Sequence, residues 1–109
     1  MEVRVQAKIW LDINGDVAFC HGKARLLAAI RERGSIRQAA RALGMSYRRA
    51  WEYLRDLERA MGTSVVATQV GGAGGGGAEL TEAGTALLGR YEGAMRAVSG
   101  ALGQNVVTV

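Results

Sequence analysis

A turn of about three residues between two helical segments limits the possible folds of this chain more than any other feature. Ser35 is a suitable N-cap for a short helix over residues 36–43, and Gly44 follows it. Ser46 is a second N-cap and opens a longer helix, whose apolar positions recur at helical spacing. These positions are Ala50, Leu54, Leu57 and Met61. The pair is typical of a helix-turn-helix, although many helical hairpins share the pattern without touching nucleic acid.

The N-terminal part predicts a strand, a tight turn and a first helix. Apolar and polar residues alternate over residues 3–13, which is the period of a half-buried strand. Asn14-Gly15 tolerates positive φ at both positions and predicts a hairpin that extends to residue 19. From about residue 23 the apolar period becomes helical, and Gly34 ends that helix. We therefore expect a strand or hairpin over residues 3–19 and three helices over residues 23–62.

A glycine-rich stretch, QVGGAGGGGAELT at residues 69–81, allows three interpretations. A phosphate loop needs a lysine and a hydroxyl after its last glycine, and Ala78 and Glu79 stand there instead. A flexible linker is the second interpretation. The flanking residues favour the third: β-branched residues precede the glycines, and a short returning strand before the next helix would complete the wing of a winged helix over residues 64–80.

At the tip of such a wing, exposed glycine amides can approach a phosphate backbone closely. The candidate tip residues are Gly74, Gly75 and Gly76. A loop that makes no contacts with DNA is the alternative.

The last segment predicts a long helix over residues 81–103 with one apolar stripe. Part of this stripe must cover the first helix. The helix is longer than such a core requires, so we expect its far end to pair with a second copy of the chain. The candidate dimerisation residues are Leu87, Tyr91, Met95, Val98 and Leu102. A monomer with a frayed end is the alternative, since glycines interrupt the segment. The predicted fold is mostly α with a small β component (α+β), a single winged helix-turn-helix domain over residues 1–109.

Composition narrows the function classes. The net charge is +4, and residues 34–62 concentrate positive charge, largely as arginine, which suits contacts to phosphate and guanine. A single cysteine excludes an intramolecular disulfide and suits a reducing compartment. The sequence shows neither an export leader nor an apolar run long enough to cross a membrane, so we expect a cytoplasmic protein without a membrane partner. With one histidine and no converging carboxylates, we expect no enzyme activity, no metal and no cofactor.

The outward face of the helix opened by Ser46 supplies candidate contacts to duplex DNA. Arg48 or Arg49 can bond guanine O6 and N7, and Glu52 can accept from cytosine N4. Residues further along the helix suit phosphate. The full candidate set is Arg37, Arg41, Ser46, Tyr47, Arg48, Arg49, Glu52, Arg55 and Arg59. The alternative is that Glu52 pairs with neighbouring arginines on a solvated helix face.

Two stretches, GSIRQAARALGMSYRRAWEYLRDLE and VATQVGGAGGGGAELTEAG, resemble the N-terminal winged-helix domain of the ModE family of molybdate-responsive transcription regulators. That domain is itself similar to the LysR-type DNA-binding domain. The resemblance covers about residues 3–102 and implies a homodimer on an inverted-repeat operator. It places the helix opened by Ser46 in the major groove, the Gly71–Gly77 loop as the wing and the helix from Thr81 at the dimer interface. Family members that sense molybdate do so through C-terminal domains, and this chain ends at Val109, so we expect no molybdate binding by this chain alone.

Three function classes follow. The first is a transcription regulator that binds duplex DNA site-specifically and is linked to molybdenum metabolism. The second is a protein-interaction adaptor or molybdenum-handling protein that uses the same fold without site-specific DNA binding. The third, an enzyme or oxyanion carrier, has the least support, because the sequence offers no acid, base or metal-binding constellation.

Overall fold

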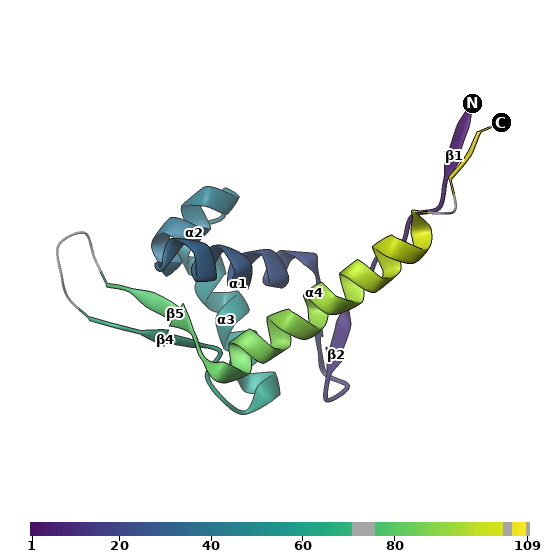
Figure 1. Ribbon diagram of the computed structural model, residues 1–109. Coiled ribbons are helices and arrows are strands. Elements are labelled where there is room, and N and C mark those ends of the chain that lie inside the picture. The colour runs from purple at the N-terminus through teal and green to yellow at the C-terminus, as the bar shows by residue number, and fades with distance from the viewer. Residues whose placement is uncertain (71–75, 104–105, 109) are drawn as a thin grey trace.

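The computed structural model describes residues 1–70, 76–103 and 106–108 (Figure 1). In these residues the helices are α1 (His21–Arg33), α2 (Ile36–Leu43), α3 (Tyr47–Met61) and α4 (Glu82–Leu102). The strands are β1 (Glu2–Arg4), β2 (Leu11–Ile13), β3 (Val17–Phe19), β4 (Val66–Thr68), β5 (Ala78–Leu80) and β6 (Val106–Thr108). They form the antiparallel pairs β1–β6, β2–β3 and β4–β5. The α+β winged-helix prediction is confirmed.

Hydrogen-bonded caps set the helix boundaries that the sequence predicts. Ser35 Oγ accepts from the Gln38 N–H at 3.2 Å at the start of α2. Ser46 Oγ accepts from the N–H of Arg49 at 3.0 Å at the start of α3. Gly44 ends α2 at φ 70°. Glycine adopts this left-handed conformation at little energetic cost because it has no side chain. The turn between α2 and α3 is therefore fixed at both ends by local chemistry.

The prediction of one continuous strand over residues 3–13 is wrong. The structure has two short strands there, β1 and β2, and each pairs with a different partner. Val3 and Val5 are 49% and 53% exposed, so no core covers the predicted apolar face. β1 pairs with β6 at the far end of α4, where the two termini lie side by side (Figure 1). Alternation predicts an extended backbone but does not identify its partner.

The predicted Asn14-Gly15 turn is confirmed, with φ of 52° and 72° at the two residues. The Asn14 side chain donates to the Ala60 carbonyl oxygen at 3.0 Å, which ties the hairpin to the C-terminal end of α3.

The core lies where α1, α2, α3 and the first half of α4 meet. Its largest fully buried side chains are Phe19, Leu26, Leu27, Ile30, Leu54, Leu57, Val65 and Leu88. Phe19 meets Tyr91 edge to face with ring centroids 5.5 Å apart, so the β2–β3 hairpin and α4 share this core.

The first half of α4 packs within its own chain. Leu87 and Tyr91, two of the residues predicted to mediate dimerisation, are 8% and 6% exposed and belong to the core. Arg31 of α1 donates two hydrogen bonds to the Glu92 carboxylate, from Nη1 to Oε1 and from Nη2 to Oε2, each at 3.1 Å. Beyond this ion pair α4 projects away from the other helices towards the termini (Figure 1). Met95, Val98 and Leu102, on this projecting part, are only partly buried.

Backbone hydrogen bonds fix the base of the β4–β5 wing. The Ala78 N–H donates to the Gly34 carbonyl oxygen at 2.8 Å, which joins β5 to the end of α1. The Gln69 N–H donates to the Gly77 carbonyl oxygen at 2.8 Å. A side chain at Gly76 would overlap the Gln69 carbonyl oxygen, so the strands can approach this closely only with glycine there. The predicted tip residues Gly74 and Gly75 lie outside the described residues.

Candidate nucleic-acid interface

The outward face of α3 carries a row of exposed charged side chains, as the sequence predicts. Arg48, Glu52, Arg55 and Arg59 are all exposed, opposite the buried Ala50, Leu54 and Leu57. Arg48 Nε lies 3.4 Å from Glu52 Oε1, and the Arg48 side chain is 90% exposed. Such an exposed pair contributes little to stability, so both side chains are free to exchange partners.

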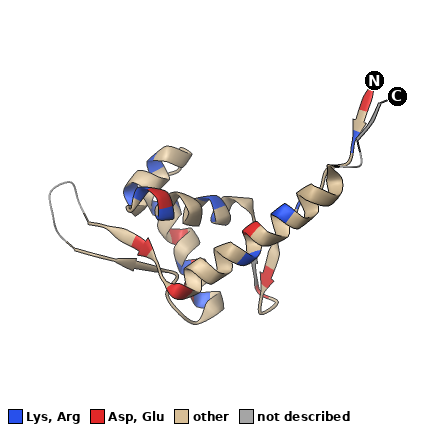
Figure 2. Cartoon of the chain, in the orientation of Figure 1, with Lys and Arg blue, Asp and Glu red and all other residues tan. Residues whose placement is uncertain are grey.

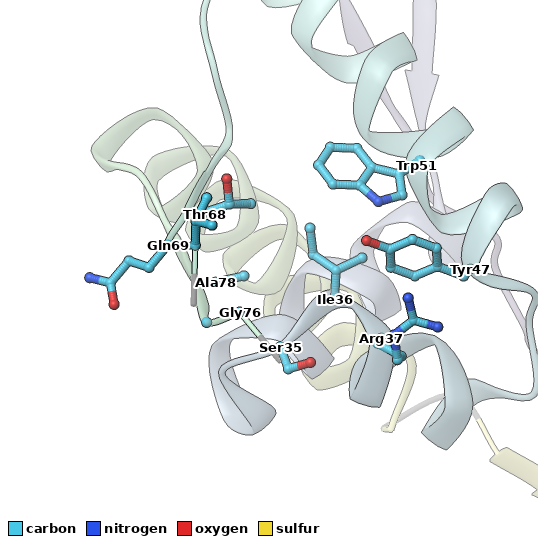
Figure 3. Close-up of a pocket in the computed structure, with 11 residues that line it drawn as sticks. Ser35, Ile36, Arg37, Tyr47, Trp51, Thr68, Gln69, Gly76 and Ala78 are labelled. Atoms are coloured by element: carbon cyan, nitrogen blue, oxygen red, sulfur yellow. The ribbon is translucent and has the colours of Figure 1, made fainter. Parts of the chain in front are cut away.

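One flank of α3 carries a stack of a cation on an aromatic ring. The Arg37 guanidinium carbon, from α2, lies 4.2 Å from the centroid of the Tyr47 ring. Tyr47 in turn meets Trp51 edge to face, with centroids 6.3 Å apart (Figure 3). This arrangement holds the Arg37 guanidinium beside the N-terminal end of α3 while leaving the residue exposed.

A groove of about 350 Å³ joins this flank to the wing. Ser35, Ile36, Arg37, Tyr47 and Trp51 line its helical side, and residues 68–70 and 76–78 line its wing side. In Figure 3 the Ile36 side chain lies between Tyr47 and Trp51 of α3 on one side and the residues of the wing base on the other, and Arg37 lies beside Tyr47. The wing base and the N-terminal half of α3 therefore border one continuous surface.

The other flank of α3 carries a second set of cations around an aromatic ring. Lys23 Nζ, from the first turn of α1, lies 5.1 Å from the centroid of the Tyr53 ring. The Arg49 guanidinium carbon lies 5.4 Å from the same centroid. Hydrogen bonding to the Tyr53 side chain raises the pKa of Arg49 above its ordinary value. Arg49 thus lies beside the outward row of α3, and its predicted contact with a base stays a prediction.

The sequence predicts a DNA contact for neither Lys23 nor Tyr53. Lys23 stands 26 positions before Arg49 in the chain, and no helical spacing relates two residues on separate helices. Arg41, which the sequence also predicts to contact DNA, is exposed in the last turn of α2.

Charge is distributed unequally between the helices and the wing. Lys and Arg residues lie on all four helices, whereas β5 carries an acidic residue (Figure 2). Residues 64–80 contain no Lys or Arg, and Glu79 is their only ionisable side chain of either charge. Any attraction of the wing to a polyanion would therefore have to come from backbone amides and polar side chains.

Neither a membrane-spanning segment nor a metal site is found in the described residues. None of the four described helices is both long and apolar enough to span a membrane. Within the same residues, no three His, Cys, Asp or Glu side chains come together in a group that could hold a metal ion.

Comparison with known proteins gives a family match. The profile described as "Bacterial regulatory helix-turn-helix protein, lysR family" matches residues 22–85, which run from the start of α1 to the start of α4. The chain is 44% identical over 69 residues to the molybdenum-pterin-binding protein MopB of Rhodobacter capsulatus, which covers 63% of this chain and 26% of that protein.

Two further relatives carry regulator or transport names. The molybdenum transport protein ModE of Azotobacter vinelandii is 33% identical over 88 residues, covering 81% of this chain and 33% of that protein. The DNA-binding transcriptional dual regulator ModE of Escherichia coli K12 is 39% identical over 67 residues, covering 62% and 26% of the two chains. The chain thus spans between about a quarter and a third of the length of these relatives.

Proposed function

Because the chain belongs to the bacterial regulatory helix-turn-helix proteins of the LysR family, we propose that it regulates transcription by binding a specific site in duplex DNA. The observation that carries this proposal is the row of exposed side chains on α3, bordered by the groove that leads to the wing. A major groove about 12 Å wide admits an α-helix, and the N-terminal residues of a recognition helix reach base edges. The proposed link to molybdenum metabolism rests on the names of the relatives.

Arg48 and Glu52 are the proposed sequence-reading residues. Both stand in the first half of α3 and face outward, and their mutual contact at 3.4 Å is weak enough to be replaced by DNA. Arg48 would donate to guanine O6 and N7, and Glu52 would accept from cytosine N4. Arg55 and Arg59, further along α3, would contact phosphate, as would Arg37 from α2.

A homodimer on an inverted repeat is the proposed assembly. The projecting half of α4 carries Met95, Val98 and Leu102, which are only partly buried within one protomer. Substituting Val98 by Asp should turn a dimer into a monomer in sedimentation velocity, whereas the same change at the exposed neighbour Ala97 should not. A wild-type chain that sediments as a monomer at every concentration would contradict this assembly.

Selection of bound duplexes from a random pool tests site-specific binding. We expect the wild-type chain to enrich one inverted-repeat sequence, which yields a binding site independently of any target gene. Arg48→Ala should reduce the preference for the selected duplex over random duplex by about 5- to 150-fold, the equivalent of ~1–3 kcal/mol for a bidentate base contact. Arg90→Ala, at an exposed arginine of α4, is the matched control and should leave the preference unchanged. If no sequence is enriched, site-specific regulation is wrong.

The name of the relative MopB supports a second candidate function for this chain, a molybdenum-handling or adaptor role without site-specific DNA binding. Equilibrium dialysis with molybdate separates the two. Molybdate binding by a chain that shows no preference among duplexes would support this second role.

A further inference from the structure

We propose that Lys23 and Arg49, both held over the Tyr53 ring, form a second contact with the DNA phosphate backbone, on the flank of α3 opposite the Arg37–Tyr47 stack. This inference rests on the proposed DNA-binding function and extends it. It gives the interface a residue from α1, which lies outside the helix-turn-helix.

The two tyrosines place these stacks on opposite sides of the recognition helix. Tyr47 and Tyr53 are six residues apart in α3, which corresponds to about 120° around the helix axis. Ala50 and Leu54 lie between them on the buried side, and Arg48 and Glu52 face outward. Both stacks therefore border the outward row, one on each side of it.

The dimensions of duplex DNA fit this arrangement. An α-helix with its side chains is about 10–12 Å wide and fills a major groove of about 12 Å. Its two flanks then face the phosphate strands on the two sides of the groove. With Arg37 facing one strand, the set of Lys23 and Arg49 would face the other.

The helix dipole does not favour a lysine where Lys23 stands, and the contact of this side chain within the protein is with the Tyr53 ring. Lys23 lies in the first turn of α1, where the helix dipole is already positive and disfavours a cation. That turn contains no acidic residue. A residue that breaks a local stability rule is a candidate for a functional role.

The two cations also lack a competing anion. Across the part of the chain that the structure describes, neither Lys23 nor Arg49 forms an ion pair. The acidic side chain that acts on Arg49 is Glu52, whose own contact is with Arg48. The positive charge beside Tyr53 is thus not neutralised within the described protein, and the ring restricts where both cations lie.

The ring itself is held in place by α1. A Cβ at Gly22 would lie 3.5 Å from the Tyr53 ring, so the ring rests directly on the backbone at the start of that helix. Tyr53 is only partly exposed. Ordering of Lys23 and Arg49 by a fixed ring lowers the conformational entropy that each would lose on meeting a phosphate.

The test compares Lys23→Gln with Lys8→Gln, its matched control at the other lysine of the chain, which is exposed. Fluorescence anisotropy gives the affinity of each protein for the selected duplex and for random duplex over a series of salt concentrations. We expect Lys23→Gln to weaken both complexes by the same factor and to reduce the slope of log K against log salt by about 0.9. Lys23→Arg should keep the wild-type slope, and Lys8→Gln should match the wild type.

The same anisotropy measurements on Arg49→Gln form the second part of the test. We expect it to weaken both duplexes equally, in contrast to Arg48→Ala, which should reduce the preference for the selected duplex. Circular dichroism of the helices identifies any variant that has lost its fold. If Lys23→Gln unfolds, Lys23→Arg still tests whether a positive charge at this position maintains the wild-type salt slope.

Several outcomes overturn the inference while leaving the proposed function intact. One is a wild-type protein that prefers the selected duplex together with a Lys23→Gln variant of unchanged affinity and slope. Another is an Arg49→Gln loss confined to the selected duplex, which would make Arg49 a base-reading residue. If the wild type binds neither duplex, both the proposed function and this inference are wrong.

Discussion

Gly84, in the first turn of α4, is the position at which a single methyl group should disturb the fold most clearly. Its backbone N–H donates to Thr81 Oγ1 at 3.1 Å, and the residue is buried against the strand that leads into the wing. A Cβ at this position would lie 3.0 Å from the Val65 carbonyl carbon and closer still to the carbonyl oxygen. The obstacle is backbone, which cannot rotate away as a side chain can.

The size of the effect follows from two destabilising contributions and one stabilising contribution. Forcing an extra methyl group into a packed site typically costs about 1–3 kcal/mol. Displacing the Val65 carbonyl also weakens the hydrogen bond that it accepts from the Thr81 N–H at 3.0 Å, which contributes about 0.5–1.5 kcal/mol. The gain from replacing glycine by alanine in a helix is at most ~1 kcal/mol. We therefore expect Gly84→Ala to lower the free energy of unfolding by about 1–3 kcal/mol.

Gly89→Ala is the matched control, because it makes the same change in the same helix. Gly89 is exposed, and a Cβ there would have nothing within 4 Å in the described chain. We expect it to raise the free energy of unfolding by about 0.5–1 kcal/mol. Urea unfolding followed by circular dichroism gives both values, and the thermal midpoint should move by about 4–8 °C for each kcal/mol. A Gly84→Ala variant as stable as Gly89→Ala would refute the argument that the Val65 backbone blocks this position.

Three smaller effects are also expected. Ser35→Ala removes the hydroxyl that caps α2 and should lower the free energy of unfolding by about 1 kcal/mol in the same urea assay. Glu92→Gln removes the exposed ion pair with Arg31 and should lower it by ~0.2–1 kcal/mol at neutral pH. Arg31 holds the pKa of Glu92 below its ordinary value, so this difference should be complete above pH about 4.3 and should vanish as the pH falls through the lower folded value. Gly76→Ala should disturb the wing base, lowering duplex affinity in the anisotropy assay with a smaller loss of stability than Gly84→Ala.

The helix-turn-helix could be predicted from the sequence because its boundaries depend on local chemistry. A cap acts within three residues of itself, as the Ser35 and Ser46 hydroxyls do, and Gly44 adopts its left-handed conformation without help from distant residues. The buried face of α3 follows from periodicity alone, and Ala50, Leu54 and Leu57 are fully buried as expected.

Pairing between distant segments could not be predicted in the same way. The alternation in residues 3–13 is real, but β1 finds its partner at the other end of the chain and β2 finds it across the Asn14 turn. The apolar stripe of α4 likewise does not reveal where the core of one protomer ends. Leu87 and Tyr91 prove to lie inside it, while the dimer role of Met95, Val98 and Leu102 stays a prediction.

The two flanks of α3 illustrate the same limit at the candidate site. A helical wheel separates the outward row from the buried face, yet it cannot show that Tyr53 meets Lys23 from α1 or that Tyr47 meets Arg37 from α2. These contacts depend on how three helices cross, and that crossing is set by the packed core. Position within α3 places Arg49 near the N-terminal end of the helix, but it does not show that the Arg49 guanidinium lies beside the Tyr53 ring.

The wing depends on this helical packing more than its own sequence suggests. Without Lys or Arg between residues 64 and 80, it has no charge of its own to draw it to a phosphate strand. Its position beside α3 is instead set at its base, where the Ala78 N–H binds the carbonyl of Gly34, the glycine that ends α1 and precedes the Ser35 cap of α2. Because α2 carries Arg37 against Tyr47, one short turn places the wing base, the Arg37 guanidinium and the start of α3 relative to one another. Changes at this turn should therefore affect stability and DNA affinity together, whereas changes in the exposed row of α3 should affect DNA affinity alone.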